Sequence, residues 1–236
     1  MIVILTDFGD DEYVGVMKGV ILSIYDKSDI IDLFHHVKPQ CVKEGAWILY
    51  NNYKLFPHGS IFLCVVDPGV GGDRQAVVVK TKNHYFVGPD NGLMFPAAMD
   101  DGVEKIVKLD TKQASKTFHG RDVFAKAAVL LEKGEDVEGE ETVLKERLKF
   151  DEKGEVVRID GFENIITNLK KLNKNNYNTI INKKNLELKL YNTYSEAPND
   201  ELFLIIGSCN TLEISMKNGR ATDKLKVEVG DKIRIR

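Results

Sequence analysis

The first 130 or so residues alternate between short apolar runs and longer segments with helical spacing, and this alternation constrains the fold more than any other feature. Apolar runs at 2–6 and 29–35 predict strands, 59–72 predicts a buried strand that runs into a glycine-rich loop, and the segments 13–25, 42–56 and 122–134 predict helices. The runs 75–81 and 84–92 predict a hairpin that ends in a Pro-Asp-Asn-Gly turn. Strands that alternate with helices are typical of an α/β domain with a mainly parallel sheet.

The pattern changes beyond residue 132. Residues 132–155 are crowded with charge and poor in large apolar residues, which is typical of a connection between domains. Short β-rich runs separated by turn residues follow to the end of the chain. We therefore predict an α/β domain over 1–150 and an antiparallel β-barrel domain over 151–236.

Charge and cysteine content narrow the class of partner. The formal net charge is -3 although 29% of the residues are charged, so no basic field is available to hold nucleic acid. Three widely spaced cysteines favour neither a disulfide framework nor a zinc site. The N-terminal apolar run is too short for a signal peptide and no segment reaches membrane-spanning length. We expect a cytoplasmic protein with a small-molecule partner and no membrane association.

Four polar clusters follow apolar runs and are the candidate functional segments. In an open α/β sheet, ligands bind outside the carboxyl ends of the strands, so the first two clusters are expected to meet at one crevice. The "DFG" and "GRD" triplets occur in the wrong order for a protein kinase, and "VDPGVGGDR" lacks the Gly-Lys-Ser/Thr of a phosphate-binding loop. The clusters are "TDFGDDEY" (6–13), "VDPGVGGDR" (66–74), "TFHGRD" (117–122) and "IDGFENIITN" (159–168).

The residues in these clusters allow more than one interpretation. The acidic side chains of 7–12 together with His35 or His36 are a candidate set for a divalent cation, as in a metal-dependent phosphohydrolase. A helix start is the favoured interpretation of Asp10, Asp11 and Glu12, but not of Asp7, which stands at the end of the strand. Asp67 is either a turn residue or a site residue, and the second interpretation requires partners.

Arg74 and His119 are the candidate partners of Asp67. Arg121 and Asp122 are explained by their position at the start of a helix, whereas His119 is not.

Taken together, the motifs resemble those of the S-adenosylmethionine hydroxide adenosyltransferases, also called S-adenosylmethionine hydrolases, which are relatives of the fluorinase and chlorinase 5'-halogenases. The resemblance runs nearly end to end, and seven motifs occur in the right order. They are "TDFGDDEYVGVMKGVI" (6–21), "DLFHHVKPQ" (32–40), "VVDPGVGGDR" (65–74), "VGPDNG" (87–92), "TFHGRDVFAKAA" (117–128), "DGFENIITN" (160–168) and "GSCNTLEISMKNGRA" (207–221).

The resemblance implies an N-terminal α/β domain, a C-terminal β-barrel, and a homotrimer whose active sites lie between subunits. It places the family's catalytic set on Asp67, Arg74 and His119. It implies substrate contacts at Asp7 for the ribose hydroxyls, Thr117 and Phe118 near the ribose 5' carbon, Asp160 for the methionine ammonium, Phe162 and Asn164 for adenine, and Ser208 for the methionine carboxylate. No metal or cofactor is implied, because S-adenosylmethionine is itself the substrate.

Five positions depart from the family pattern. Glu163 stands where a glycine is usual, Phe34 where a threonine is, and Lys126 where a proline is. Cys209-Asn210 stands where small residues make a turn, and this change touches the methionine end of the expected site.

The chemistry implied by the resemblance is hydrolysis of S-adenosylmethionine to adenosine and methionine. Methionine leaves as a neutral thioether, so the reaction needs a nucleophile rather than a general acid, and Asp67, His119 and Arg74 offer a base, an imidazole and a fixed cation for activating water. A carboxylate beside a halide ion would repel it, so Asp67 favours hydroxide over halide. The alternatives are a 5'-halogenase that uses chloride or fluoride, a non-catalytic S-adenosylmethionine or adenosine binding protein, and the phosphohydrolase above.

Overall fold

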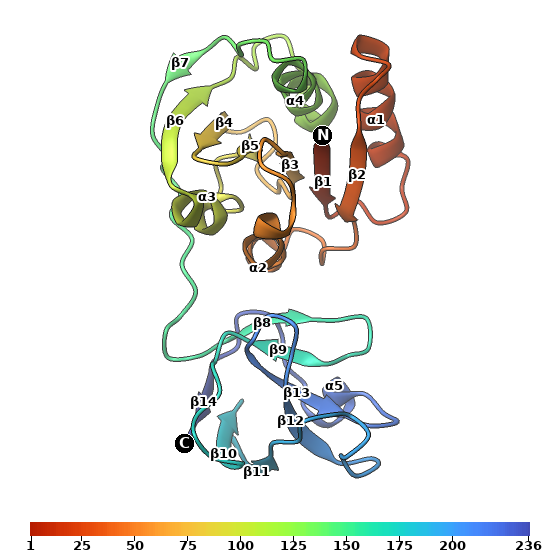
Figure 1. Cartoon of the computed structure of the whole chain (residues 1–236), viewed down its shortest axis with the longest axis vertical. Coiled ribbons are helices and arrows are strands. Elements are labelled where there is room, and N and C mark those ends of the chain that lie inside the picture. Colours follow the sequence, from red (N-terminus) through yellow and green to blue (C-terminus); the bar gives the residue numbers. More distant parts are fainter. The chain divides into compact units, whose positions relative to one another are not determined.

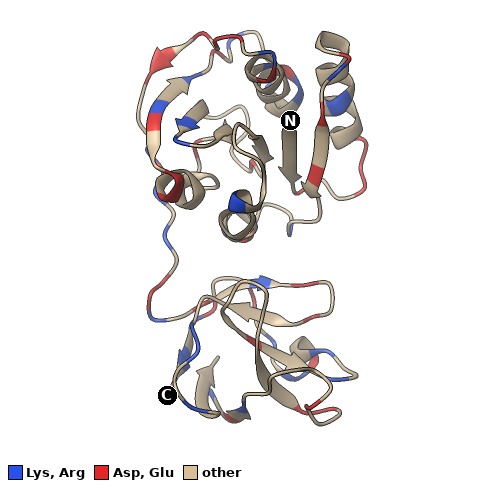
Figure 2. Ribbon diagram, in the orientation of Figure 1, with Lys and Arg blue, Asp and Glu red and all other residues tan.

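The computed structural model describes all 236 residues. The chain divides into two compact units, Met1–Leu148 and Lys149–Arg236. Both signs of charge are interspersed over each unit (Figure 2). None of the helices combines the length and the apolar character that a membrane span needs.

The N-terminal unit is built on a seven-stranded sheet of order β2-β1-β3-β5-β4-β6-β7. The pairs that join β2, β1, β3 and β5 are parallel, and the pairs that join β5, β4, β6 and β7 are antiparallel. The α/β prediction is confirmed, and the sheet is mixed with a parallel core. The strands are β1 (Ile2–Thr6), β2 (Ile30–Phe34), β3 (Ile61–Val65), β4 (Ala76–Thr81), β5 (Tyr85–Pro89), β6 (Val103–Lys108) and β7 (Glu140–Glu141).

Helices cover both faces of this sheet (Figure 1). On one face α1 (Tyr13–Ile24) and α4 (Ala125–Glu132) pack together against an apolar cluster that includes Ile4, Leu63 and Phe124. On the other face lie α2 (Val42–Asn52), continued by a 3-10 turn at Tyr53–Leu55, and α3 (Phe95–Asp101). All five residues of β1 and of β3 are buried, which explains why both read as continuous apolar runs in the sequence.

The charged stretch after residue 132 is not simply a connection. Glu140–Glu141 adds the edge strand β7 to β6, and Leu144 is buried. The carboxylate of Asp90 accepts the backbone N–H groups of Lys145 (2.8 Å) and Glu146 (3.4 Å). Backbone pairing and one buried leucine therefore keep residues up to Leu148 within the N-terminal unit despite their charged composition.

The C-terminal unit contains two antiparallel sheets and no closed barrel, so the barrel prediction is wrong. One sheet has the order β11-β10-β14 and the other β12-β13-β9-β8. Between the sheets the ladder is reduced to the isolated bridges Glu155↔Lys232 and Leu190↔Leu204, with a further hydrogen bond from the Gly230 N–H to the Val156 carbonyl (2.8 Å). The elements are β8 (Val156–Ile159), β9 (Ile165–Thr167), β10 (Asn176–Ile181), β11 (Lys184–Lys189), β12 (Leu202–Ile206), β13 (Leu212–Met216), α5 (Ala221–Lys224) and β14 (Ile233–Ile235).

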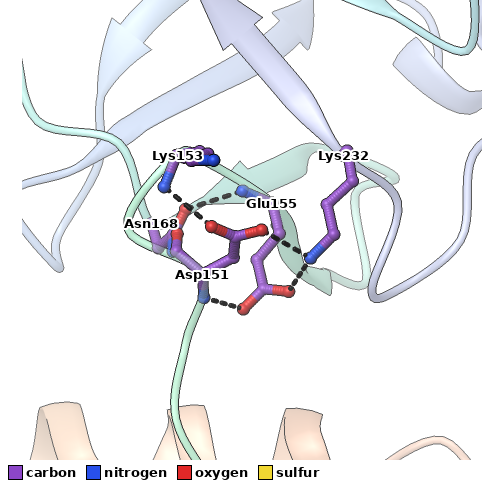
Figure 3. A network of polar contacts seen from close by, with 5 residues as sticks. All are labelled: Asp151, Lys153, Glu155, Asn168 and Lys232. Atoms are coloured by element: carbon purple, nitrogen blue, oxygen red, sulfur yellow. Dashed lines mark hydrogen bonds and ion pairs between the residues drawn. The ribbon is translucent and has the colours of Figure 1, made fainter.

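The first residues of the C-terminal unit are held by the polar network drawn in Figure 3. Glu155 is fully buried; it accepts the Asp151 backbone N–H (2.7 Å) and lies 3.4 Å from the Lys232 ammonium, which also pairs with Asp151 at 2.9 Å. The side chain of Asn168 donates to the Asp151 carbonyl and accepts from the Glu155 N–H. These contacts tie residues 151–155 to both sheets of the unit.

Candidate active site

Strand register brings the first two polar clusters together. Strands β1 and β3 are parallel neighbours, and their last residues, Thr6 and Val65, lie opposite each other. The chain leaves both strands at the same sheet edge, so Asp7 and Asp67 follow side by side. Burial is the main cause that raises the pKa of Asp7, and the Asp67 charge adds to it, as expected for two neighbouring carboxylates. The prediction that these two clusters meet at one crevice is confirmed.

The arginine predicted as a partner of Asp67 pairs with it in a fork. Arg74 donates from Nε to Oδ1 of Asp67 (3.0 Å) and from Nη2 to Oδ2 (2.5 Å). The side chains of Arg74 and Asp67 are only 9% and 5% exposed. A bidentate pair of this kind fixes the carboxylate in orientation as well as in charge.

The third polar cluster reaches the same point because two loops touch. Gly71 has φ +75°, and a Cβ at this position would overlap the Lys116 carbonyl, so only glycine allows the 66–74 loop to lie against the 116–119 segment. His119 then lies with its Nδ1 2.7 Å from Nη2 of Arg74. The structure thus assembles Asp67, Arg74 and His119, which are separated in sequence by up to 52 positions.

This contact determines the protonation state of His119. A guanidinium can only donate hydrogen bonds, so Nδ1 must be an acceptor and the ring proton must sit on Nε2. Burial, reinforced by the Arg74 charge, lowers the pKa of His119 below its ordinary value of 6.5. His119 is therefore held as a neutral imidazole whose Nε2–H is a donor.

These groups surround a pocket of about 440 Å³ at the sheet edge. Asp67 and His119 line the pocket, whereas Arg74 does not, so the arginine holds these two side chains in place without lining the pocket itself. Thr117 and Phe118 also line the pocket, as the sequence predicts. The Phe118 ring packs edge-on against Phe8 and Tyr13, at 5.9 and 5.3 Å between ring centroids, which makes one wall apolar.

Asp7 lines the same pocket and is held by a residue that the sequence argument did not single out. Its Oδ2 accepts the backbone N–H of Gln40 at 2.7 Å. Burial raises the pKa of Asp7 and outweighs the lowering effect of its backbone hydrogen bonds. Gln40 belongs to the quoted 32–40 motif and has φ +65°, but a backbone donor leaves no signature in residue type.

The charged neighbours of His119 have a local role, as predicted. Arg121 donates to Asp122 from Nε (2.6 Å) and Nη2 (2.9 Å), and Asp122 also accepts the Ser115 N–H. Both lie in a single π-helical turn, Gly120–Phe124, that precedes α4. Such turns are frequent at functional sites, and this one presents His119 at its start.

The acidic residues near the N-terminus do not gather into a metal site. No group of three or more His, Cys, Asp or Glu side chains in the chain has a metal-binding arrangement. Asp10 pairs with His36 (3.2 Å), and His35 lies between Asp32 and Thr6, each at 3.0 Å. The side-chain set that the phosphohydrolase interpretation requires is therefore not assembled.

The remaining predicted residues lie in the C-terminal unit. Asp160, Phe162 and Ser208 line a second pocket of about 440 Å³, and Phe162 is 80% exposed. Asn164 is buried beside this pocket but not among its lining residues, and its Nδ2 donates to Asp160 at 3.0 Å. Three further polar residues line the pocket that the sequence argument did not assign: Arg158, Tyr194 and Glu213.

Two departures from the family pattern have local explanations. Glu163 adopts φ +63°, the left-handed region where glycine is favoured, and its carboxylate accepts a hydrogen bond from the Thr222 hydroxyl (2.5 Å). Asn210 adopts φ +58° in the turn that joins β12 to β13, where its N–H donates to the Gly207 carbonyl (2.9 Å). Asparagine tolerates this conformation better than most residues, so the turn is kept.

Fold, loops and site together define one class of protein. Residues 2–140 match the SAM hydroxide adenosyltransferase N-terminal domain and residues 154–234 match the corresponding C-terminal domain. The chain therefore belongs to the SAM (S-adenosylmethionine) hydroxide adenosyltransferase family, as the motifs predict.

Individual relatives indicate the activity more specifically than the family match does. The chain is 46% identical over 182 residues to the (R)-S-adenosyl-L-methionine hydrolase of Methanocaldococcus jannaschii, covering 72% of this chain and 67% of the relative. It is 32% identical to the (R)-S-adenosyl-L-methionine hydrolase of Thermus thermophilus, covering 98% and 97%. A fluorinase of Nocardia brasiliensis is more distant, at 24% over 214 residues. The crystal structure of an uncharacterized conserved protein from Thermotoga maritima superposes with a TM-score of 0.91 at 36% identity over the whole of both chains.

Proposed function

We propose that this protein hydrolyses S-adenosyl-L-methionine to adenosine and L-methionine. The observation that carries the proposal is the buried Asp67–Arg74–His119 assembly at the edge of a pocket that also contains Asp7. Its relatives named as (R)-S-adenosyl-L-methionine hydrolases support the same reaction.

The reaction is a displacement at the ribose 5' carbon. A water oxygen forms the new C–O bond while the bond from the 5' carbon to sulfur breaks, and the electron pair of that bond leaves with methionine as a neutral thioether. Water has a pKa of about 15.7, so its proton must be accepted as the bond forms. Asp67 is the acceptor in this proposal, since its carboxylate lines the pocket and is oriented by Arg74.

His119 orients the attacking water. Because Nδ1 is engaged by Arg74, the group left for the pocket is the Nε2–H, which donates to the water oxygen and leaves the water protons directed at Asp67. Asp7 accepts hydrogen bonds from the two ribose hydroxyls, for which two carboxylate oxygens are a geometric match. Charge is cancelled as the nucleophile meets the sulfonium, so a pocket that excludes water lowers the barrier.

The direct test is to incubate the protein with S-adenosylmethionine and to follow adenosine by chromatography. Asp67→Asn and His119→Ala should each lower kcat by about 10²- to 10⁴-fold, the usual contribution of a positioned acid–base group. Asp73→Asn, in the same loop, and His58→Ala are the matched controls, because both residues are exposed and should leave kcat unchanged. Full activity in either site variant would refute the assignment, and no adenosine from the unmodified protein would refute the function.

We also propose that the protein is a homotrimer in which Asp160, Phe162, Asn164 and Ser208 of one subunit serve the Asp67 site of a neighbour. Asp67 lines a pocket in the N-terminal unit, whereas Asp160, Phe162 and Ser208 line a separate pocket in the C-terminal unit, which supports a site completed by association. Light scattering should give three times the mass of 26.6 kDa. Mixing Asp67→Asn with Asp160→Ala protein should restore part of the activity, and a monomeric, fully active protein would contradict the proposal.

A further inference from the structure

The pocket of the C-terminal unit contains a carboxylate whose charge is only partly offset, by one arginine. Glu213, on β13, lines this pocket although the residue is only 7% exposed. Its carboxylate makes no hydrogen bond or ion pair with another residue, and its oxygens are not fully enclosed because the side chain lines the pocket. A buried carboxylate without a partner is costly, and such groups in proteins are normally paired.

The other carboxylate of the pocket is in the opposite situation. Asp160 accepts three hydrogen bonds within its own turn, from the backbone N–H groups of Phe162 and Asn164 at 2.9 Å each and from the Asn164 amide at 3.0 Å. Asp160 thus has a structural role in shaping the β8–β9 turn in addition to any contact with a ligand. Glu213 is the carboxylate whose acceptor capacity is unused.

The position of Glu213 is dictated by the β12–β13 hairpin. Its carboxylate lies against Gly207, just beyond β12, where any Cβ would overlap Oε1 and Cδ of Glu213. The absence of a side chain at Gly207 therefore creates the space that the carboxylate occupies. Gly207 directly precedes Ser208, the residue at which the methionine carboxylate contact is expected, and Ser208 and Glu213 line the same pocket.

The charged and titratable groups around Glu213 come from three elements. Asp160 lies in the turn after β8, Arg158 on β8, and Tyr194 in the segment before β12, where its hydroxyl lies 3.1 Å from the Ser215 hydroxyl. Burial, with the Asp160 charge adding to it and Arg158 opposing, raises the pKa of Glu213 to about 7. Two acidic groups against one arginine leave the pocket suited to a further positive charge.

We infer that Glu213 is a specificity-determining residue that binds the α-ammonium group of the amino-acid portion of the substrate, together with Asp160. An ammonium carries three N–H donors, enough to satisfy Glu213 and to use the remaining acceptor capacity of Asp160. The inference rests on the proposed function, because the α-amino acid in question is the methionine portion of S-adenosylmethionine. Glu213 takes no part in bond breaking, so its effect falls on KM rather than on kcat.

The variant Glu213→Gln keeps the size of the side chain and removes its charge. Its KM for S-adenosylmethionine should rise about ten- to one-hundredfold with kcat little changed, as expected for the loss of a charge-assisted hydrogen bond. Glu187→Gln, on an exposed position of β11, is the matched control and should leave both constants unchanged.

Substrate analogues identify the group that Glu213 binds. Dissociation constants are measured by calorimetry in the Asp67→Asn background, with and without Glu213→Gln, so that the ligand is not consumed. For the analogue that lacks the carboxylate but keeps the amine, Glu213→Gln should lower the affinity by the same factor as for S-adenosylmethionine. The analogue that lacks the amino group, and adenosine itself, should bind equally to both proteins.

The outcomes distinguish failure of the inference about Glu213 from failure of the proposed function. If the unmodified protein releases no adenosine, the proposed function fails, whereas the calorimetric comparison still reports on Glu213. If the protein is active and Glu213→Gln leaves KM and all dissociation constants unchanged, the inference is wrong. The inference is also wrong if Glu213→Gln weakens the binding of ligands that have the carboxylate but lack the amine, and does not weaken the binding of ligands that have the amine but lack the carboxylate. In the unmodified protein KM should rise as pH falls below about 7, and Glu213→Gln should remove this dependence.

Discussion

Replacing Glu213 by glutamine should stabilise the C-terminal unit at neutral and alkaline pH while it weakens substrate binding. The pKa of Glu213 is about 7 in the folded protein against 4.5 for an ordinary glutamate. Below pH 4.5 both folded and unfolded states hold the proton, so the charge costs nothing. As pH rises from 4.5 to about 7 the unfolded chain releases the proton and the folded chain retains it, which lowers the free energy of unfolding.

The size of this effect follows from the difference between the two pKa values. One pKa unit corresponds to about 1.36 kcal/mol, so a difference of about 2.5 sets an upper bound of about 3 kcal/mol above pH 7, and solvent screening of a carboxylate that lines a pocket reduces it to about 1–2 kcal/mol. Because glutamine is neutral at every pH, the variant should gain that amount over the unmodified protein at pH 8 and almost none near pH 4.5. This is a large fraction of the total stability of about 5–15 kcal/mol that is typical of a domain.

Hydrogen exchange followed by mass spectrometry can measure this gain in the relevant unit. Peptides that cover β12 and β13 (202–216) should show slower exchange in Glu213→Gln at pH 8, relative to Glu187→Gln and after correction for the intrinsic pH dependence of exchange. Peptides from β3–β5 (61–89) in the N-terminal unit serve as an internal reference. Equal protection of 202–216 in both proteins from pH 5 to 8 would show that Glu213 is not an unpaired buried charge, and the reasoning would fail.

Four further outcomes are expected. Arg74→Lys should lower activity at least tenfold and reduce the free energy of unfolding by about 1–3 kcal/mol, since a lysine cannot bond both oxygens of Asp67 and also reach His119. The free energy of unfolding is measured by urea unfolding followed through the fluorescence of Trp47, the single tryptophan, which lies in the N-terminal unit, and unchanged values would contradict the fork geometry. The acid limb of the kcat profile should lie below pH 6.5, because the pKa of His119 is lowered, and a midpoint above 6.5 would argue against a neutral imidazole. Chloride or fluoride should yield no halogenated adenosine detectable by chromatography, since the Asp67 carboxylate repels halide ions. Glu155→Ala should destabilise the C-terminal unit by about 1–3 kcal/mol in hydrogen exchange, because it removes a buried acceptor, and an unchanged protection pattern would show that the network in Figure 3 is dispensable.

Hydrophobic pattern predicted the N-terminal unit well and the C-terminal unit less well. The buried strands β1 and β3 appear as unbroken apolar runs because both of their faces are covered by helices. The edge strand β7 consists of two glutamates, which no hydrophobic pattern can identify, and neither α3 nor β6 is predicted from the sequence. The strands of the C-terminal unit were recognised, but barrel closure depends on pairing between the ends of short strands, and this pairing is not encoded in the alternation of any one of them.

Residue order and motif resemblance were sufficient to name Asp67, Arg74 and His119 as members of one site and to assign the family. Whether a segment forms a strand or a helix is a local property, and so is the chemistry that a residue type offers. Both can therefore be predicted from the sequence. The tautomer of His119 and the unpaired state of Glu213 are not local, because each depends on which atoms from distant segments come within hydrogen-bonding distance. Glu213 lies within a quoted motif and reads there as an ordinary strand residue, and only the packing of β13 against Gly207 makes it a buried charge that lines a pocket.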